Sequence, residues 1–287
     1  VMVNRIWQHL MGEGLVRTPG NFGVEGERPT HPELLEWLSV QFVEGGWKVK
    51  PMIRLIMQSS VYRQASETGQ ETTDGKLATG RTEASFSDPD NRLLWRMNLK
   101  RLEAEVVRDS ILAVSGKLDT TAGGPPVMLK FQSDGKIVVD ASQLSTPTSK
   151  WRRSIYLLAR RAYNLSMLSV FDQPLISTSC SRRDTSAVPL QSLTMMNDEF
   201  VAKHAEYFAQ RLLRQVDHDP SQLIPAAFRT ALARLPDEQE AALCATSLTD
   251  QTNRYRESGI SDQEAREHAL TELCHTLLNT SEFLYAE

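Results

Sequence analysis

The stretch that decides the fold reads VNRIWQHLMGEGLVRTP over residues 3–19 and THPELLEWL over residues 30–38. Ile6, Trp7 and Leu10 recur at helical spacing in its first part, which predicts an amphipathic helix. The chain starts inside this helix, without an initiator Met, a leader or an N-cap. This start predicts a segment of a longer protein.

Two further helices follow the first one closely. Pro32 occupies the first turn of the second helix, and the pair at residues 45–46 is Gly-Gly, which ends it. Pro51 opens a third helix with its own apolar stripe. We therefore expect a compact three-helix unit over residues 1–65.

The next segment changes character. Residues 66–87 are rich in Thr, Gly, Glu, Ser and Asp, and a segment of this composition buries too little apolar surface to order itself. We expect a flexible loop there. From Asp88 a long helix is predicted to run to about Ser115, where Gly116 ends it.

The middle of the chain is the irregular part. Residues 136–139 and 154–158 are short β-branched or apolar runs that suit a small sheet. Pro189 then starts another long helix, which we expect to reach about Arg214.

The remaining sequence again shows helical periodicity, and no internal repeat emerges. The further helices are expected over residues 221–235, 236–255 and 261–279. The sequence predicts a mainly α fold: a multi-helix domain with a small irregular β-containing insertion in the middle. We treat residues 1–287 as one helical domain with four parts, which are residues 1–65, 66–87, 88–215 and 221–287.

Composition excludes several classes of function. The chain has 40% hydrophobic and 24% charged residues, which is ordinary for a globular protein, and a net charge of −4. No basic field is present to attract nucleic acid, and no apolar run is long enough to span a membrane. The three cysteines are widely spaced, with no CxxC or CxxCH motif for zinc or covalent haem.

Several ordered blocks carry a family resemblance. Together with the opening stretch, these blocks are Ser60–Gln64, Asp88–Arg96, Arg101–Glu105 with Arg108-Asp109, Arg153–Tyr156, Phe171-Asp172, Cys180 with Arg182-Arg183, Pro189–Leu193, Met196–Val201 and Asn279–Tyr285. Over nearly its whole length the chain resembles the planctomycete PSD domain of unknown function (DUF fifteen-fifty-three). It departs from that pattern at Ser181, where the family often has Pro, and at Ala187-Val188, which replace a more Thr-rich stretch.

The resemblance implies a context rather than a reaction. Domains of this family usually follow a second uncharacterised domain (DUF fifteen-forty-nine) and often a cytochrome-c-like domain. The expected partners are therefore upstream domains of the same polypeptide, in an exported, periplasmic or otherwise extracytoplasmic bacterial protein. No cofactor is expected in this chain, and haem is expected in an upstream domain.

The segment before Pro189 is the most site-like element. Arg182, Arg183, Thr185 and Ser186 precede a helix N-terminus, where two guanidiniums and free N–H groups suit a sulfate, phosphate or carboxylate. In the alternative interpretation, the arginines tie this segment to acids such as Asp198 or Glu105. Thr185 or Ser186 then caps the helix.

A pair of acidic residues offers a second candidate site. Glu105 and Asp109 lie four residues apart on one predicted helix, so they share a face. With Arg183 they suit a catalytic cleft of a hydrolase acting on carbohydrate or sulfated polymer. Structural ion pairing is the alternative.

The opening helix offers a third candidate. Arg5, Trp7 and His9 form a potential interface, including an electron-transfer surface for an upstream haem domain. The six histidines show no metal-ligand spacing, so no metal site is predicted. The leading prediction is a non-catalytic domain acting in docking and in binding an anionic or glycan ligand.

Overall fold

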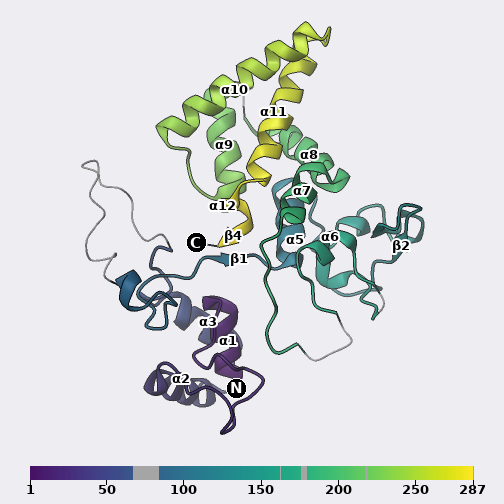
Figure 1. The fold of residues 1–287 in the computed structure, drawn as a ribbon. Helices are drawn as coiled ribbons and strands as arrows, with labels where there is room; N and C mark the ends of the chain where they lie inside the picture. Colours follow the sequence, from purple (N-terminus) through teal and green to yellow (C-terminus); the bar gives the residue numbers. More distant parts are fainter. Residues whose placement is uncertain (67–83, 162, 176–179, 217–218, 287) are drawn as a thin grey trace. The chain divides into compact units, whose positions relative to one another are not determined.

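The computed structural model describes residues 1–66, 84–161, 163–175, 180–216 and 219–286. The chain divides into two compact units. The N-terminal unit contains residues 1–100, together with the C-terminal end from Tyr285, and the C-terminal unit contains residues 101–284. Figure 1 shows the course of the chain through both units.

Three helices form the core of the N-terminal unit in its described residues 1–66. They are α1 (Met2–Met11), α2 (Pro32–Glu44) and α3 (Val49–Met57). Each packs against the other two. Trp7, Phe42 and Ile56 lie in their common core. Burial of these apolar faces holds the unit together.

A buried asparagine explains the glycine-rich loop after α1. The Asn4 side chain is fully buried, donates a hydrogen bond to the Val16 carbonyl at 3.0 Å and accepts one from the Val16 amide at 2.8 Å. A Cβ atom at Gly14 would lie 2.6 Å from the Asn4 amide nitrogen. Only glycine lets the loop approach the helix this closely.

The long helix predicted from Asp88 to Ser115 is wrong in its first half. The Asp88 carboxylate accepts hydrogen bonds from the Arg92 and Leu93 amides, at 2.9 and 2.7 Å. Asn91 and Leu94 have left-handed backbone angles, with φ of 50° and 57°. These turns exclude a helix, because left-handed residues interrupt the i to i−4 hydrogen bonds.

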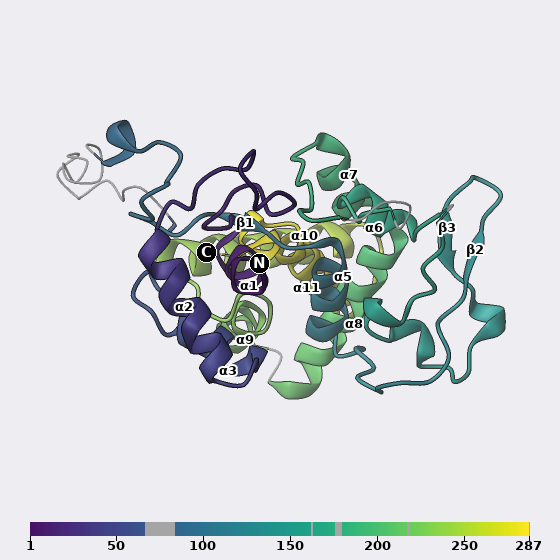
Figure 2. The same cartoon turned by 90° about the horizontal axis from the view of Figure 1, so that it is seen from below.

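The C-terminal unit is also mainly helical (Figures 1 and 2). Its helices are α5 (Ala104–Val114), α6 (Ser166–Val170), α7 (Pro189–Asn197), α8 (Glu199–Gln215), α9 (Pro220–Leu232), α10 (Glu238–Glu257), α11 (Asp262–Leu278) and α12 (Ser281–Leu284). Helix α11 packs extensively against α10 and α8. Ile111, Phe208 and Leu270 belong to one continuous core.

The helix predicted from Pro189 to Arg214 is two helices. Asp198 separates α7 from α8, with an extended backbone at φ −75° and ψ 128°. Its carboxylate accepts a hydrogen bond from the Phe200 amide at 2.9 Å and so caps α8. The apolar periodicity continues across this break, which is why periodicity alone missed it.

The β-containing insertion lies in the middle of the chain, as predicted. Strands β2 (Leu129–Phe131) and β3 (Ile137–Val139) form an antiparallel pair. The strand predicted at residues 154–158 is wrong, because the 3₁₀ turn η3 (Ser154–Tyr156) occupies most of it. The short 3₁₀ helices η1 (Ala141–Gln143) and η2 (Ser149–Trp151) precede this turn.

A second small sheet pairs β1 (Lys100–Arg101) with β4 (Tyr285–Ala286). The predicted mainly α fold with a small β-containing insertion is therefore confirmed. The loop predicted at residues 66–87 lies mostly outside the described residues, and its end at residues 84–87 forms a helical turn.

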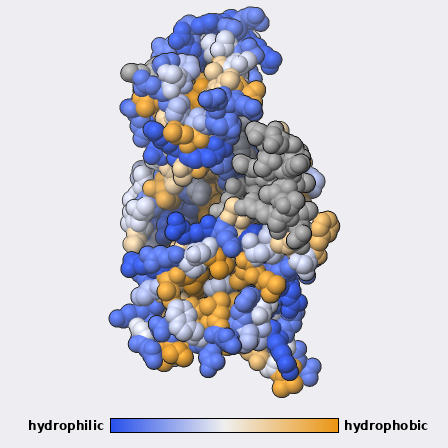
Figure 3. Space-filling view, turned by 90° about the vertical axis from the view of Figure 1, so that its left-hand side faces the viewer, coloured by the Kyte–Doolittle hydropathy of each residue, from blue (hydrophilic) through white to orange (hydrophobic). Residues whose placement is uncertain are grey.

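The surface carries both polar and apolar side chains. Trp37, Val40 and Val43 on α2 and Trp47 after it are exposed in the N-terminal unit. Figure 3 shows apolar patches among hydrophilic side chains on one face of the molecule. In the described part of the chain, no helix is both long and apolar enough to cross a membrane.

Candidate functional site

A cleft of about 620 Å³ in the C-terminal unit brings together three residues that the sequence predicted to share a site. Glu105 and Asp109 project from α5, and Arg183 comes from the segment before α7. The 3₁₀ turn η3, with Ser154 and Ile155, and helix α6, with Leu168, supply other parts of the lining. All three residues therefore line one cleft.

Much of the cleft wall is apolar. Leu129, Leu157 and Leu168 line it, and all three also belong to the core of the unit. Ile155 and Val106 line it from the exposed side, with 75% and 43% of their surface accessible. None of the described residues that line the cleft is aromatic.

Arg183 and Glu105 form a bidentate ion pair. The two guanidinium nitrogens of Arg183 donate to the two carboxylate oxygens of Glu105, at 2.6 and 3.1 Å. Glu103 is a second acidic partner of Arg183, at 3.4 Å. Burial, the largest single influence, raises the pKa of Glu105, but the hydrogen bonds and charge of Arg183, a backbone hydrogen bond and a hydrogen bond from Gln173 together outweigh it, so the pKa lies below its ordinary value. Glu105 is therefore ionised at neutral pH.

Asp109 is held by a different set of groups. Its Oδ1 atom accepts hydrogen bonds from the backbone amide and the hydroxyl of Ser154, at 2.8 and 2.7 Å. Arg153 lies 3.6 Å from Oδ2, and 59% of its side chain is exposed. A guanidinium at the rim of the cleft thus remains accessible to a ligand.

Arg108 is buried beside Asp109 on α5. The sequence did not identify it as a site residue. It is 1% exposed and donates to the carbonyls of Lys150 and Arg152 at 3.0 and 2.9 Å. It also donates to the Ser154 hydroxyl at 3.1 Å. Burial lowers the pKa of Arg108 to about 10, and Asp109 partly opposes this shift. The sequence does indicate that Arg108 is buried, because it lies between Val107 and Ile111 on the apolar stripe of the helix.

The chemistry open to these groups is limited by their pairing. Glu105 is paired with Arg183, and Asp109 accepts hydrogen bonds from Ser154, so both carboxylates already have partners within the protein. A general acid requires a raised pKa, and that of Glu105 is lowered. Across the described ranges, no group of three or more His, Cys, Asp or Glu side chains is placed to hold a metal ion.

Of the four residues predicted to bind an anion before α7, Arg183 and Ser186 bind carboxylates of the protein itself, Glu105 and Asp172 respectively. The Ser186 amide and hydroxyl donate to Asp172 at 2.8 and 2.9 Å. Arg101 pairs with the same carboxylate at 2.8 Å. Thr185 and Arg182 are exposed. Capping of the helix by Thr185 or Ser186 is wrong, because the N-cap is Val188 and makes no side-chain cap.

The candidate interface on α1 separates into a buried and an exposed part. Trp7 is 4% exposed and packs in the core of the N-terminal unit. Arg5 and His9 are exposed on the same helix. The indole therefore contributes to packing rather than to an exposed surface.

Comparisons with known proteins give a family but no reaction. Residues 1–248 match the model of a family described as a protein of unknown function (DUF1553). No curated protein and no solved structure matches the chain. Since the matched region covers most of the chain, including the residues of the cleft, the protein belongs to the DUF1553 family.

Proposed function

We propose that this protein acts as a non-catalytic docking domain, whose cleft beside α5 binds a polypeptide segment of a partner domain. The observation that carries the proposal is the bidentate pairing of Arg183 with Glu105 inside a large, partly apolar cleft. This arrangement fixes charges for recognition, and the lowered pKa keeps the Glu105 carboxylate ionised at neutral pH.

The lining favours a polypeptide over a glycan. Sugar rings commonly stack on aromatic side chains, and the described lining residues include none. Ile155 and Val106 instead offer exposed apolar surface for apolar side chains. Arg153 at the rim offers donors for carbonyl or carboxylate oxygens of a peptide.

The resemblance supplies a candidate partner. A domain that precedes this one in the same polypeptide would present its segment at high effective concentration, so a weak intrinsic affinity would suffice. We extend the proposal to an extracytoplasmic bacterial protein in which a haem-bearing domain lies upstream.

The alternative is a hydrolase acting on carbohydrate or sulfated polymer. Glu105, Asp109 and Arg183 do line one cleft, and this observation favours the alternative. The lowered pKa of Glu105 and its closed ion pair oppose it, because glycoside hydrolysis needs a carboxylic acid with a raised pKa.

The test is selection of short random peptides on the intact protein, followed by fluorescence-polarisation titration of the selected peptides. Ile155→Asp places a charge on the exposed apolar wall and is expected to weaken binding about tenfold or more. Leu243→Asp is the matched control, because Leu243 is 71% exposed on α10, outside the cleft.

Three outcomes contradict the proposal. Selected peptides whose affinity is unchanged by Ile155→Asp bind elsewhere, and failure to select any peptide removes the docking function. Hydrolysis of chromogenic glycosides that Glu105→Gln abolishes would establish the hydrolase instead.

A further inference from the structure

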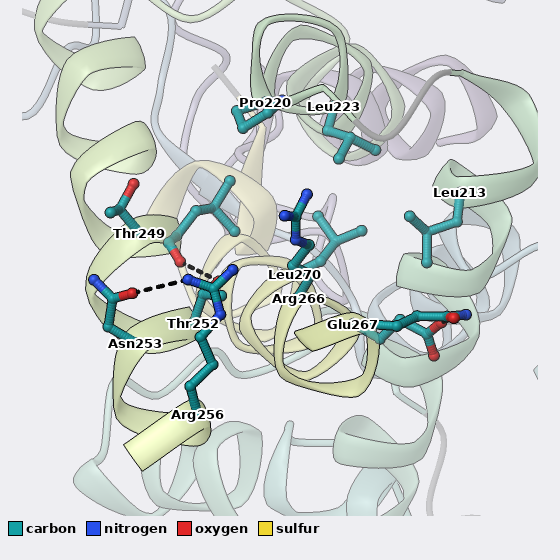
Figure 4. Close-up of a pocket in the computed structure, with 12 residues that line it drawn as sticks. Leu213, Pro220, Leu223, Thr249, Thr252, Asn253, Arg256, Arg266, Glu267 and Leu270 are labelled. Carbon is teal, nitrogen blue, oxygen red and sulfur yellow. Dashed lines mark hydrogen bonds between the residues drawn. The ribbon is translucent and has the colours of Figure 1, made fainter. Parts of the chain in front are cut away.

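A second cavity lies among the C-terminal helices, away from the cleft. Its volume is about 220 Å³, and α8, α9, α10 and α11 surround it. Its apolar lining consists of Leu213, Pro220, Leu223, Leu248 and Leu270. Figure 4 shows Pro220 and Leu223 on one side of this space and Leu213 on another.

The two threonines in the lining do not need a hydrogen bond from a ligand. Thr249 and Thr252 donate their hydroxyl hydrogens to backbone carbonyls of α10, at 2.9 and 2.6 Å. Since both hydroxyls are satisfied within the helix, they do not require a polar partner from the cavity. The interior therefore suits an apolar group.

Two arginines line the cavity. Arg256 and Arg266 both line it, and both pair with the carboxylate of Asp262. Arg256 also donates to the Asn253 side chain at 3.2 Å (Figure 4). Two guanidiniums that share one carboxylate leave a net positive charge among these three groups.

Among the described residues that line the cavity, Glu267 is the acidic one. Its carboxylate accepts a hydrogen bond from the Gln263 amide at 3.1 Å. Figure 4 shows Glu267 on the side of Leu213, with Asn253 and Arg256 on the opposite side. Figure 4 thus places Arg256 apart from the acidic residue, whereas Arg266 is drawn between them.

We propose that this cavity binds a short aliphatic monocarboxylate, with its chain against the leucines and its head group on Arg256 and Arg266. An apolar cavity of about 150 Å³ suffices for benzene, so 220 Å³ accommodates a somewhat larger hydrocarbon group. A guanidinium matches a carboxylate in bidentate geometry, and Arg266 is 59% exposed at its side chain, so a head group can reach it.

The experiment is calorimetric titration of the intact protein with butanoate, hexanoate and octanoate, and with 1-octanol as the neutral counterpart. Affinity is expected to rise roughly fourfold per methylene until the chain fills the cavity. The alcohol is expected to bind about tenfold or more weakly than octanoate, because it lacks the charge-assisted hydrogen bonds.

Two variants locate the binding. Arg266→Gln is expected to reduce octanoate affinity about tenfold and to leave 1-octanol unchanged. Leu223→Trp fills the cavity and is expected to abolish binding of both compounds. Arg254→Gln is the matched control, because Arg254 is an exposed arginine of α10 outside the lining. Circular dichroism of each variant separates lost binding from lost folding.

Absence of octanoate binding to the unmodified protein overturns the proposal. Equal affinity for octanoate and 1-octanol overturns the assignment of an anionic ligand. Octanoate binding that survives both Arg266→Gln and folded Leu223→Trp overturns the location.

Discussion

At the scale of single residues, Arg108 is the clearest structural determinant of the C-terminal unit. Its guanidinium joins α5 to the carbonyls of Lys150 and Arg152, residues more than forty positions away in the chain. A buried arginine with several acceptors fixes one geometry, because each acceptor would be unsatisfied without it.

Arg108→Met is expected to lower the free energy of unfolding by about 3–5 kcal/mol, since it leaves the carbonyls of Lys150 and Arg152 without their donor and removes one of the two guanidiniums beside Asp109. Urea denaturation followed by circular dichroism measures this loss. Arg254→Met, at an exposed position, is the control and should change stability by less than about 0.5 kcal/mol. A loss below about 1 kcal/mol for Arg108→Met would contradict the role assigned to it.

His204 is expected to make stability depend on pH. It is 3% exposed, between Phe200 and Tyr207, and burial lowers its pKa from 6.5 to about 4. The unfolded chain then binds a proton more readily than the folded one, so this contribution is complete above pH 6.5 and is lost as pH falls toward 4.

Between pH 7 and pH 5 this effect amounts to about 2 kcal/mol. His204→Phe is expected to remove that part of the pH dependence, as measured by urea denaturation at both pH values. His268→Gln removes an exposed imidazole from the same unit and should leave the slope in place. An unchanged slope in His204→Phe would show that another group is responsible.

At the scale of elements, α10 depends on its first turn. It is 20 residues long and packs along α11, yet Leu248 is its one fully buried residue. The Asp237 carboxylate accepts from the Glu240 amide at 2.7 Å, and the Glu240 carboxylate accepts from the Asp237 amide at 2.8 Å. This capping box satisfies two amides at the start of the helix.

Asp237→Ala is expected to destabilise the start of α10 by about 1 kcal/mol, because it removes the cap. Asp237→Asn retains an oxygen acceptor, so it should destabilise the start of α10 less than Asp237→Ala does. Amide hydrogen exchange at the N-terminal turn of α10 distinguishes the two variants. Equal exchange rates in Asp237→Ala and the unmodified protein would mean that the network around Arg234 holds the helix start.

That network is a second support for the same helix. Arg234 donates to both carboxylate oxygens of Glu240 and of Glu282, at 2.6–2.7 Å. The hydrogen bonds from Arg234 lower the pKa of Glu240 to about 2. Glu240 therefore remains charged, and the capping box intact, in moderately acidic solution.

The elements differ in how well the sequence predicts them. Helices with an explicit first-turn Pro or an acidic cap, such as α2 and α10, agree with expectation. The region after Asp88 and the break at Asp198 do not. The apolar spacing continues through both places. In each, however, an aspartate carboxylate accepts a hydrogen bond from a following backbone amide, and this hydrogen bond competes with the helical one.

At the scale of the whole molecule, the two separate hydrophobic cores are expected to give two cooperative units. Ile56 is 1% exposed in the core of the N-terminal unit, and Ile111 is fully buried in that of the C-terminal unit. Ile56→Ala is expected to lower the free energy of unfolding of the N-terminal unit alone by about 2–5 kcal/mol. Ile111→Ala is expected to have the same effect on the C-terminal unit alone.

Hydrogen-exchange mass spectrometry in urea assigns each loss, because peptides report on one unit at a time. Each variant serves as the control for the other. If either substitution raised exchange equally throughout both units, the chain would unfold as a single cooperative body.

The sequence by itself determined the family, the mainly α class and most helices, because helical periodicity and capping act between residues a few positions apart. It also named Glu105, Asp109 and Arg183 as a candidate group. Only the tertiary structure decided which groups these side chains pair with. Arg183 meets Glu105 across 78 positions, and the irregular segment between them folds back to close that ion pair. Burial and hydrogen bonding then set the charge of Glu105, and no local pattern encodes either.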